Sequence, residues 1–500
     1  MGCYRMKTFN AYDFFIEQRN IKAKNLKTNM IISKHEKITY GDFHQSVTEK
    51  YASFFRQIDD CSRMGILLFD SVFQQILFWG ALRSGITPGI FSVSQTKDLI
   101  LKTINAASID ILIAGQDHIQ TAKAAVDFCK LKRVYVVDEN CDLKLLYQNP
   151  KLPKGQKEGR VILFSSGTTG ISKGILHDQI DMKYAASTYG EQVLKLGNQD
   201  ILYSMATLNY GFAFTNSTFQ AVYGGSSAII DKDVDIWDIV DNIKKFKPTV
   251  ICGVPAIFDA LANVSRASQL DLGSVRLALS SGEKMAESLW NRLNDEFKIE
   301  VIEGYGSVEM LTNVISNKKE SFLKGSSGKI LEGFEYELEK LDSDGDEKFL
   351  GVLKVKGPSI SNMTIESQEN KSKIYITRDV FRIDSDGFFH YCGRKDDMYK
   401  VNGVWFSPLQ VEKHLESLQI FSGATVVNVN MEIVAYVTLK DPELLDFSKA
   451  QSITRWLRHD KNQMICPSKY IVVETLLRNF NGKKLRIEID KKHIIKTVEG

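Results

Sequence analysis

Residues 164–174 read FSSGTTGISKG, and this stretch directly follows the apolar run Val161-Ile162-Leu163. Its glycines let the backbone turn tightly and let a ligand approach the peptide amides closely. Its hydroxyl groups donate hydrogen bonds and Lys173 adds a positive charge, so the set suits the oxygens of a polyphosphate. A plain flexible loop between two strands is the alternative interpretation, and the stretch matches neither GxxxxGK[ST] nor GxGxxG. The hydroxyl groups belong to Ser165, Ser166, Thr168 and Thr169.

The chain is too long for one ordinary core, because single hydrophobic cores stop growing beyond roughly 250–300 residues. With 500 residues, of which 43% are hydrophobic and 25% charged, a soluble globular protein of two or more domains is expected. The 64 basic and 61 acidic residues give a net charge of +3. A balance this even predicts neither a nucleic-acid partner nor a membrane surface.

The cysteines and the first residues indicate a cellular compartment. The seven cysteines are scattered without a CxxC pair, which is typical of a reducing compartment. Residues 1–10, MGCYRMKTFN, lack the apolar core of a secretory signal, and either Met1 or Met6 could start the chain. No apolar run reaches the roughly 18–20 residues of a membrane span. We therefore predict a cytoplasmic protein without a membrane span.

Short apolar runs alternate with helical patterns along the first 325 residues. Continuous apolarity over a few residues suits strands that are covered on both faces, as in parallel sheets. Helical patterns at 71–84 and 285–297 lie between such runs. The alternation predicts an α/β fold with parallel or mixed sheets flanked by helices. The apolar runs span 64–70, 109–115, 132–138, 228–233, 249–255, 275–282 and 299–306.

The pattern changes twice towards the C-terminus. Turn-rich, alternating segments from about 325 to 393 predict a β-rich lobe that completes a large N-terminal domain of residues 1–393. Beyond residue 394 the pattern mixes helices and strands. It predicts a small α+β C-terminal domain of residues 394–500. The expected elements there are helices at 408–418 and 452–460 and strands at 423–430, 432–440 and 470–475.

The order of residues 165–174 closely resembles the signature of the ANL superfamily of adenylate-forming, AMP-binding enzymes. This family includes acyl-CoA synthetases, nonribosomal peptide adenylation domains and luciferases. In it the segment is a mobile loop over the β- and γ-phosphates of ATP. The resemblance implies that Lys173 and the hydroxyls of Thr168 and Thr169 handle departing pyrophosphate, with Thr168 and Lys173 as catalytic residues. The loop residues expected to bind ATP are Ser165, Ser166, Gly167, Thr168, Thr169, Gly170 and Lys173.

Residues 304–309, GYGSVE, resemble the family's YGxTE segment. By this resemblance Tyr305 stacks on adenine, Ser307 donates to the α-phosphate and Glu309 holds Mg²⁺ as a catalytic metal ligand. A hard cation does prefer a carboxylate combined with phosphate oxygens. The triplet 281–283 resembles the segment that edges the adenine pocket, and a helix-capping turn is its plainer interpretation. The residues expected to bind nucleotide here are Ser281, Gly282, Glu283, Tyr305, Gly306 and Ser307.

Residues 375–379, YITRD, stand where the family usually has YxTGD. By resemblance Asp379 accepts hydrogen bonds from both ribose hydroxyls, as an acceptor-only carboxylate can. Arg378 replaces the usual glycine, a departure that some aryl-CoA ligases share. Residues 393–403, GRKDDMYKVNG, resemble the family's GRxDD segment, and Arg394 is expected to contact the ribose.

The same segment supplies residues for a second reaction step. Asp396 is the expected hinge about which the C-terminal domain rotates. Lys400 and Gly403 are expected to bind cofactor, with Gly403 beside the tunnel of the thiol acceptor. The family commonly has Arg at the position of Trp405, and aromatic-acid ligases also carry Trp there.

A last motif lies near the C-terminus. Residues 478–486, RNFNGKKLR, resemble the family's terminal GKxxR segment. Lys483 is therefore expected to be the catalytic lysine that reaches the carboxylate during adenylation and contacts the nucleotide, with Lys484 as the alternative. By motif, the resemblance spans roughly residues 160 to 486.

The stretches 208–216 and 253–256 lie where the family lines its acyl pocket. Their aromatic and small residues can form a flat slot for an aromatic ring, although packing in the core explains each aromatic residue equally well. Together with residues 400–412 they resemble the benzoate/anthranilate-CoA ligase branch, from which Asn209 and Thr312 depart. The residues expected to bind substrate are Tyr210, Gly211, Phe212, Val254, Pro255, Ser281 and Gly304.

These motifs predict an ATP-dependent carboxylic acid–thiol ligase. It would form an acyl-adenylate with release of pyrophosphate and then an acyl-CoA thioester and AMP, using ATP, Mg²⁺ and coenzyme A on a small aromatic acid. A stand-alone ligase that loads the phosphopantetheine of an acyl carrier protein shares every motif and stays open, as does the choice of monomer or homodimer. A non-catalytic sensor should have lost a key residue, but all are present: Lys173, Glu309, Asp379, Arg394 and Lys483.

Overall fold

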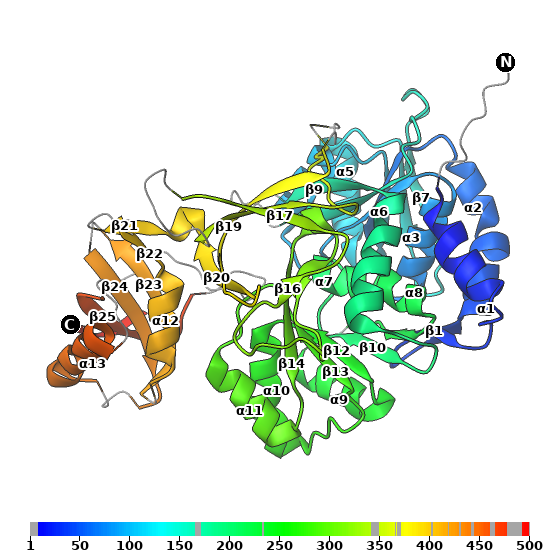
Figure 1. Ribbon diagram of the computed structural model, residues 1–500. Helices are drawn as coiled ribbons and strands as arrows, with labels where there is room; N and C mark the ends of the chain where they lie inside the picture. The colour runs from blue at the N-terminus through cyan, green and yellow to red at the C-terminus, as the bar shows by residue number, and fades with distance from the viewer. Residues whose placement is uncertain are drawn as a thin grey trace.

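The computed structural model describes most of the chain, and its strands form five sheets with helices packed around them (Figure 1). The structure describes twelve ranges of the chain. These ranges are 9–165, 172–232, 235–341, 350–365, 367, 372–401, 404–418, 420–429, 432–441, 445–460, 466–477 and 493–499.

The first sheet has seven strands in the order β7-β6-β5-β3-β4-β8-β9. Its centre is parallel, since β3 pairs in parallel with β4 and β5, whereas the outer pairs β6–β7 and β8–β9 are antiparallel. Antiparallel neighbours can be joined by a short turn. The predicted phosphate-loop stretch, residues 164–174, therefore includes the connection between β8 and β9. The strands are β3 (Arg63–Leu67), β4 (Thr87–Ile90), β5 (Ile111–Gly115), β6 (Arg133–Val137), β7 (Leu143–Gln148), β8 (Arg160–Ser165) and β9 (Lys173–Asp178).

The second sheet has nine strands in the order β16-β15-β14-β13-β12-β10-β11-β1-β2. It is parallel from β14 to β1 and antiparallel at both ends. Ligands of open α/β sheets bind beyond the carboxyl ends of the parallel strands, where β14 carries the GYG sequence. The strands are β1 (Asn29–Ile32), β2 (Lys37–Thr39), β10 (Ile201–Ser204), β11 (Ser227–Ile229), β12 (Val250–Gly253), β13 (Leu277–Ser280), β14 (Val301–Gly306), β15 (Asn313–Ser316) and β16 (Lys329–Ile330).

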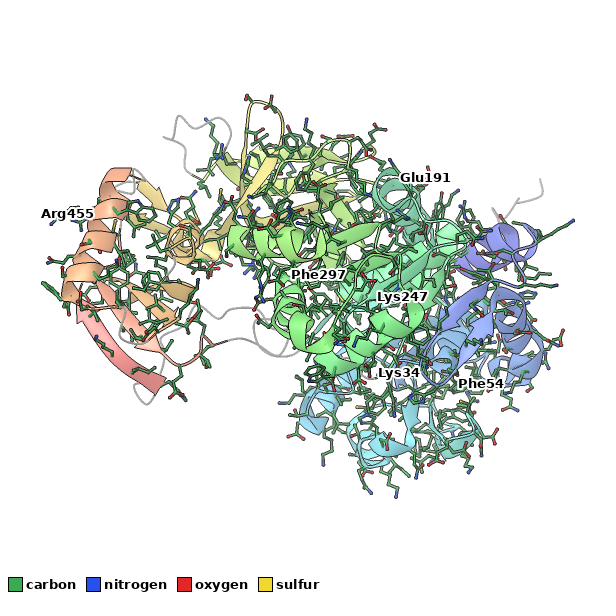
Figure 2. All side chains as sticks on the ribbon, turned by 90° about the horizontal axis from the view of Figure 1, so that it is seen from below. Lys34, Phe54, Glu191, Lys247, Phe297 and Arg455 are labelled. Atoms are coloured by element: carbon green, nitrogen blue, oxygen red, sulfur yellow. The ribbon has the colours of Figure 1, made fainter. Side chains whose placement is uncertain are left out.

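A β-rich sheet connects the large body to the C-terminal part. Its four antiparallel strands are β17 (Glu335–Glu339), β18 (Leu350–Lys356), β19 (Ile374–Ile383) and β20 (Phe389–Arg394). The C-terminal part, orange to red in Figure 1, holds the hairpin of β21 (Tyr399–Val401) and β22 (Val404–Phe406) and a mixed sheet of β23 (Phe421–Val429), β24 (Glu432–Leu439), β25 (Lys469–Val473) and β26 (Ile494–Glu499). In Figure 2, Arg455 of this part lies on the left of the view, and Phe54 of the large body lies towards the right.

The helices cover the sheets and fill the spaces between them. The longer ones include α3 (Val72–Arg83), α4 (Lys97–Ala106), α5 (Ile119–Phe128), α9 (Ile236–Phe246), α10 (Pro255–Ser268), α11 (Glu287–Phe297), α12 (Pro408–Glu416) and α13 (Phe447–Asp460). The shorter ones are α1 (Tyr40–Gln45), α2 (Ala52–Gln57), α6 (Gln179–Ala185), α7 (Gly211–Phe214) and α8 (Ala221–Gly224). Other helical segments are η1 (Asp13–Ile21), η2 (Ser46–Lys50), η3 (Gln116–His118), η4 (Ala186–Leu194), η5 (Thr215–Gln220), η6 (Val308–Met310) and η7 (Lys395–Asp397).

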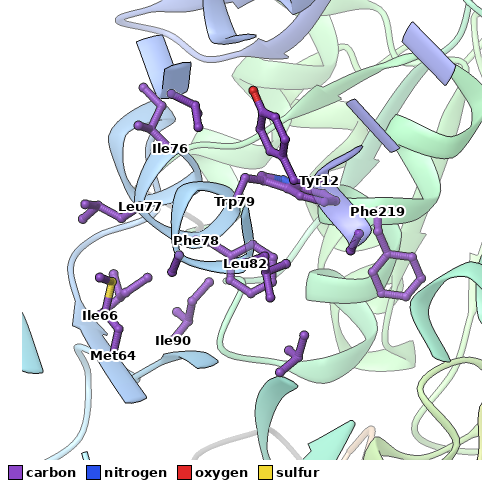
Figure 3. Packing of buried hydrophobic residues seen from close by; sticks show 14 of the residues in the cluster. Tyr12, Met64, Ile66, Ile76, Leu77, Phe78, Trp79, Leu82, Ile90 and Phe219 are labelled. Atoms are coloured by element: carbon purple, nitrogen blue, oxygen red, sulfur yellow. The ribbon is translucent and has the colours of Figure 1, made fainter. Parts of the chain in front are cut away.

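The largest core surrounds α3, which is buried along nearly its whole length. Ser71 caps this helix by accepting a hydrogen bond from Gln74 N at 3.2 Å. Figure 3 shows Trp79 and Phe78 of this helix near Phe219 in the same core, and all three are almost completely buried. A helix that is apolar on every face belongs inside a large protein, and here it is covered on all sides.

The structure confirms the predicted α/β fold and the β-rich lobe, and every predicted apolar run contains a strand. Two helix starts differ from the prediction. α13 begins at Phe447 because Asp446 accepts a hydrogen bond from Lys449 N at 2.8 Å and so caps it earlier. α11 begins only at Glu287, after Ala286, so the triplet 281–283 is not its cap.

Two further predictions concern the whole described chain. Within the described ranges, no helix combines the length and apolarity needed to cross a bilayer. No disulfide bond joins the cysteines that the structure describes.

Candidate functional site

The phosphate-loop stretch lies at the tip of the β8–β9 hairpin. Ser165 stands opposite Lys173 in the antiparallel register, and Ser165 Oγ donates to the Lys173 carbonyl oxygen at 3.5 Å. The Lys173 side chain is exposed, so its ammonium group can reach a ligand. The predicted loop residues Ser166, Gly167, Thr168, Thr169 and Gly170 lie outside the described residues.

Asp379 on β19 is the point at which three segments meet. The Tyr305 hydroxyl at the end of β14 donates to Asp379 Oδ2 at 2.6 Å, and the Tyr391 hydroxyl of β20 donates to Oδ1 at 3.2 Å. Arg394 Nε lies 3.6 Å from the same Oδ1. An ionised carboxylate offers about four lone-pair sites, so Asp379 can also accept hydrogen bonds from a ligand's hydroxyls.

Tyr305 is held as a neutral donor in this cluster. Burial and the charge of Asp379 raise the pKa of the Tyr305 hydroxyl well above its ordinary value. The ring contacts Phe381 edge-on, with 4.8 Å between the ring centroids and an interplanar angle of 75°. Its orientation is therefore fixed by a hydrogen bond at one end and by an aromatic contact on its side.

Glu309 lies on η6, directly after β14, and two contacts join this turn to the phosphate hairpin. His177 of β9 is fully buried, and its Nε2 lies 2.8 Å from the carbonyl oxygen of the residue before Glu309. Ser361 N donates to the Glu309 carbonyl at 2.8 Å, while Ser361 Oγ donates to a β9 carbonyl at 2.5 Å. The hairpin that carries Lys173 and the turn that carries Glu309 are therefore neighbours.

The donor set around Glu309 can be tested against a metal ion. The described residues contain no group of three or more His, Cys, Asp or Glu side chains placed to hold one. The charge of Glu309 adds to burial in raising the pKa of the nearby Tyr375 hydroxyl. Mg²⁺ is usually bound through one or two carboxylates plus phosphate oxygens and keeps several waters. A single carboxylate beside a phosphate hairpin fits Mg²⁺ that arrives with a nucleotide.

The GYG segment is closely packed and leaves one hydroxyl without a partner. A Cβ on Gly306 would lie 2.2 Å from the Thr312 carbonyl oxygen, and one on Gly304 would lie 2.5 Å from Asn313 Nδ2. The Ser307 hydroxyl is buried and has no hydrogen-bond partner among the described residues. Leaving a buried polar group unsatisfied costs about 1–3 kcal/mol, which a ligand oxygen at this place would recover.

The predicted adenine-edge loop is anchored by buried polar contacts. Ser281 Oγ donates to Asn313 Oδ1 at 2.9 Å. Glu303 Oε1 accepts a hydrogen bond from Met285 N at 3.1 Å and lies 3.6 Å from Lys284 Nζ. The side chains of Lys284 and Glu303 are only 12% and 9% exposed, so this is a buried ion pair. It fixes the loop to the strand that carries the GYG sequence.

The residues predicted to line the acyl pocket form two groups. A Cβ on Gly282 would lie 2.4 Å from the Tyr210 hydroxyl and 3.7 Å from Val254 Cγ1, so Tyr210 packs closely against Gly282 and Val254 lies near it. Burial, followed by the charge of Glu283, raises the pKa of Tyr210 to about 12. This phenol therefore remains a neutral hydrogen-bond donor and acceptor at physiological pH.

The second group lies at the start of α7 and α10. A Cβ on Gly211 would lie 3.3 Å from Val308 Cγ2, which connects α7 to the Glu309 turn. Pro255 is buried at the first position of α10. Phe212 packs against the second hydrophobic core, as the plainer interpretation of this aromatic residue requires.

The loop before Tyr210 is anchored by a carboxylate from the first sheet. Asp70 Oδ2 accepts a hydrogen bond from Leu208 N at 2.7 Å, and Oδ1 accepts one from Gln74 Nε2 at 3.0 Å. Burial outweighs these two hydrogen bonds and raises the pKa of Asp70 to about 6. The predicted acyl-pocket loop thus depends on a carboxyl group in the segment that follows β3 of the first sheet.

The segment between β20 and the C-terminal hairpin is more exposed. Arg378 Nη1 donates to Asp396 Oδ2 at 3.0 Å, and Gly393 has a φ of +125°, which favours glycine. The backbone of Lys400 lies in β21, whereas its side chain lies outside the described part of the chain. Gly403 and Lys483 also lie outside the described residues.

The motifs did not reveal several side chains that build the site. Tyr391, Lys284 and Glu303 were not predicted, because each acts through a partner that is distant in sequence. A weak signal existed for Glu303, since a carboxylate inside an otherwise apolar strand needs a buried partner. Tyr391 carried no signal apart from its place two residues before the glycine of the 393–403 segment.

Comparison with known proteins gives matches over most of the chain. A family profile described as "AMP-binding enzyme" matches residues 18–363. An anthranilate–CoA ligase of Pseudomonas aeruginosa is 31% identical over 363 residues, which are 67% of this chain and 66% of that enzyme. A benzoate–CoA ligase of Thauera aromatica is 27% identical over 65% of this chain and 64% of its own length. The chain thus spans just under two thirds of the length of these relatives.

Solved structures show the same fold over nearly the whole chain. The crystal structure of the anthranilate CoA ligase AuaEII in complex with anthranoyl-AMP superposes with a TM-score of 0.82. The match covers 95% of this chain and 96% of that one at 24% sequence identity. The predicted arrangement of a large N-terminal and a small C-terminal domain is therefore a known fold.

Proposed function

We propose, because the chain belongs to the AMP-binding enzyme family, that it is an ATP-dependent acid–thiol ligase that converts a carboxylic acid into an acyl-adenylate and then a CoA thioester. The observation that carries the proposal is the cluster at Asp379, where Tyr305, Tyr391 and Arg394 converge on one carboxylate. This cluster suits a ribose. The β8–β9 hairpin with Lys173 and the η6 turn with Glu309 can bind the triphosphate of the same nucleotide.

The first step needs positioning and charge stabilisation. The substrate carboxylate attacks the α-phosphorus of ATP, a mixed anhydride forms, and pyrophosphate leaves with the negative charge. Lys173 faces that charge from the hairpin tip, and Lys483 is the sequence-based candidate for the carboxylate side. Ser307 offers its unpartnered hydroxyl to the α-phosphate. Mg²⁺ held by Glu309 would supply charge neutralisation of the phosphate oxygens.

In the second step the thiol sulfur attacks the acyl carbon of the acyl-adenylate and AMP leaves, which requires the catalytic lysine to move away from the acyl group. We place the boundary between the two domains at residues 393 and 394, with Asp396 as the hinge. Asp396→Pro should block thioester formation while leaving adenylation intact to within a few-fold, because proline fixes φ and restricts rotation. Equal loss of both steps would count against the hinge assignment.

The acid is expected to be aromatic. The Tyr210 hydroxyl packs against Gly282, and the planar ring of Tyr210 offers an aromatic acid a stacking partner. Relatives described as anthranilate–CoA and benzoate–CoA ligases act on such acids. Asn209 and Thr312 depart from that branch, so the ring substituents are for experiment to define. A carrier protein as acceptor, a monomer or homodimer, and a cytoplasmic location remain predictions.

The test is ATP–pyrophosphate exchange with a panel of benzoates, aminobenzoates, hydroxybenzoates and fatty acids. We expect exchange with at least one aromatic acid, followed by thioester formation with coenzyme A in competition with a holo-carrier protein. Lys483→Ala should lower exchange by about 100-fold or more, and Lys484→Ala serves as the matched control. If no acid supports exchange, the ligase assignment is wrong and the sensor alternative returns.

A further inference from the structure

The chain leaves the β-rich sheet through one short segment. β20 ends at Arg394, and η7 leads to the β21–β22 hairpin of the C-terminal part (Figure 1). Arg378 of β19 is paired with Asp396 of η7, with 3.0 Å between Nη1 and Oδ2. The ion pair therefore joins the sheet of the large body to the segment from which the C-terminal domain extends.

Two adjacent residues of β19, one basic and one acidic, each form an ion pair with a residue that ends or follows β20. Asp379 pairs with Arg394, and Arg378 pairs with Asp396. Successive side chains of a strand point to opposite faces, so the two pairs lie on different faces of β19. The Asp379 side chain is 15% exposed, whereas those of Arg378 and Asp396 are 66% and 59% exposed. The less exposed pair, in which the Arg394 side chain is 50% exposed, belongs to the Asp379 cluster, and the more exposed pair joins β19 to the junction.

We propose that Arg378 is a positioning residue that holds the C-terminal domain in the orientation seen here by pairing with Asp396. The inference rests on the proposed function, in which that domain changes orientation between the two reaction steps. A glycine at position 378 could not make this contact. Arg378 thus sets the fraction of molecules in this orientation and, through it, the balance between adenylation and thioester formation.

The expected effect is modest because both side chains are solvated. Exposed ion pairs of this kind change an equilibrium by about 1.4- to 5-fold. A change of this size is enough to alter which half-reaction is favoured without affecting the fold. Gly393 precedes Asp396 by three residues and has a φ of +125°, a conformation that favours glycine. This requirement restricts the backbone conformations of the chain where it leaves β20.

The test measures the distance between the domains in the full-length protein. Spin-labelled residues at 247, at the end of α9, and at 455, on α13, report this distance, and Figure 2 labels both positions. In Arg378→Gln, the ratio of molecules at the distance of this structure to molecules at other distances should fall by about 1.4- to 5-fold. Arg382→Gln is the matched control, because Arg382 is also exposed on β19 and makes no ion pair with the described residues. It should leave the distribution unchanged.

Two further measurements separate a positioning role from general damage. Exchanging the charges in Arg378→Asp with Asp396→Arg should restore part of the population that Arg378→Asp loses. The adenylation and thioester-forming rates of Arg378→Gln should change in opposite directions. An unchanged distance distribution in Arg378→Gln, or an equal fall of both rates, overturns the proposal. The distance measurement needs no catalysis, so absence of ATP–pyrophosphate exchange in the unmodified protein would refute the proposed function separately.

Discussion

Two regions of the molecule hold their site residues by different means. In the large body, the buried carboxylates of Glu303 and Asp70 each accept a backbone N–H from a loop of the site, at 3.1 and 2.7 Å. At the junction, Arg378 and Asp396 form a solvent-exposed ion pair. Removing one partner of a buried ion pair leaves the other charge buried and unpaired. In an exposed pair, water solvates the remaining charge, so little stability is lost. The loops predicted to surround adenine and acid are thus fixed more firmly than the junction.

The largest expected effect comes from removing a buried anchor. Glu303→Ala leaves Lys284 buried without its partner and should lower the free energy of unfolding by about 3–5 kcal/mol. Urea denaturation monitored by fluorescence measures the loss. Glu335→Ala is the control, because the Glu335 and Lys356 side chains are 74% and 53% exposed and the cost should stay below about 1 kcal/mol. Similar losses in both variants would remove the contrast between the regions.

The next effect concerns ligand binding at the cluster where the two regions meet. Asp379→Asn replaces a charged acceptor by an amide that offers one acceptor oxygen to the tyrosine donors and to the ribose. Hydrogen bonds to charged groups contribute about 1.5–3 kcal/mol, so the KM for ATP should rise by about 10- to 100-fold. Pyrophosphate exchange at varied ATP measures it, with the exposed-turn variant Asp386→Asn as control. An unchanged KM would place the ribose elsewhere.

The success of the motifs and their failures have a physical explanation. Tyr305, Asp379 and Arg394 were predicted because each belongs to a short contiguous segment with a characteristic order. Tyr391 and Lys284 were not, because their roles come from strand register and from contacts between distant segments. Arg378 was noticed only as a departure from the usual glycine, and its partner became visible only when β19 and η7 were placed side by side.

The fold shows the same division between local and distant information. Apolar runs predicted the buried strands because a strand covered on both faces needs continuous apolarity. Strand order, and the antiparallel hairpin that carries the phosphate loop, depend on pairing that no single stretch encodes. The boundary at residues 393 and 394 and the roles of Lys400, Gly403 and Lys483 remain predictions.

The raised pKa of Asp70 should make the free energy of unfolding depend on pH. Its pKa is raised from 3.8 to about 6 by burial, so the folded state binds the proton more tightly than the unfolded state. Stability should therefore decrease as the pH rises from about 4 to about 6 and then stay level. Asp70→Asn should remove a decrease of about 1–2 kcal/mol, measured as the urea midpoint between pH 4 and 7.

Asp60 provides a comparison of opposite sign. Burial alone would raise its pKa, but the side chains of Arg133 and Lys132 outweigh burial and lower it. Its contribution is present above about pH 4 and is lost as the pH falls. Asp60→Asn should consequently lose stability at pH 7 and match the unmodified protein in acid. If both variants showed the same slope, these two carboxyl groups would not be the source of the pH dependence.

The smallest expected effect is the response to salt, and it tests the junction directly. Raising NaCl from about 0.1 to 1 M shortens the Debye length from about 10 Å to about 3 Å, which weakens exposed ion pairs far more than buried ones. The ratio of molecules at the interdomain distance of this structure to molecules at other distances should fall by up to about 5-fold in the unmodified protein. In Arg378→Gln the same change should have little effect, because the charge that salt screens is already gone. An identical salt response in both proteins would mean that other charges orient the C-terminal domain.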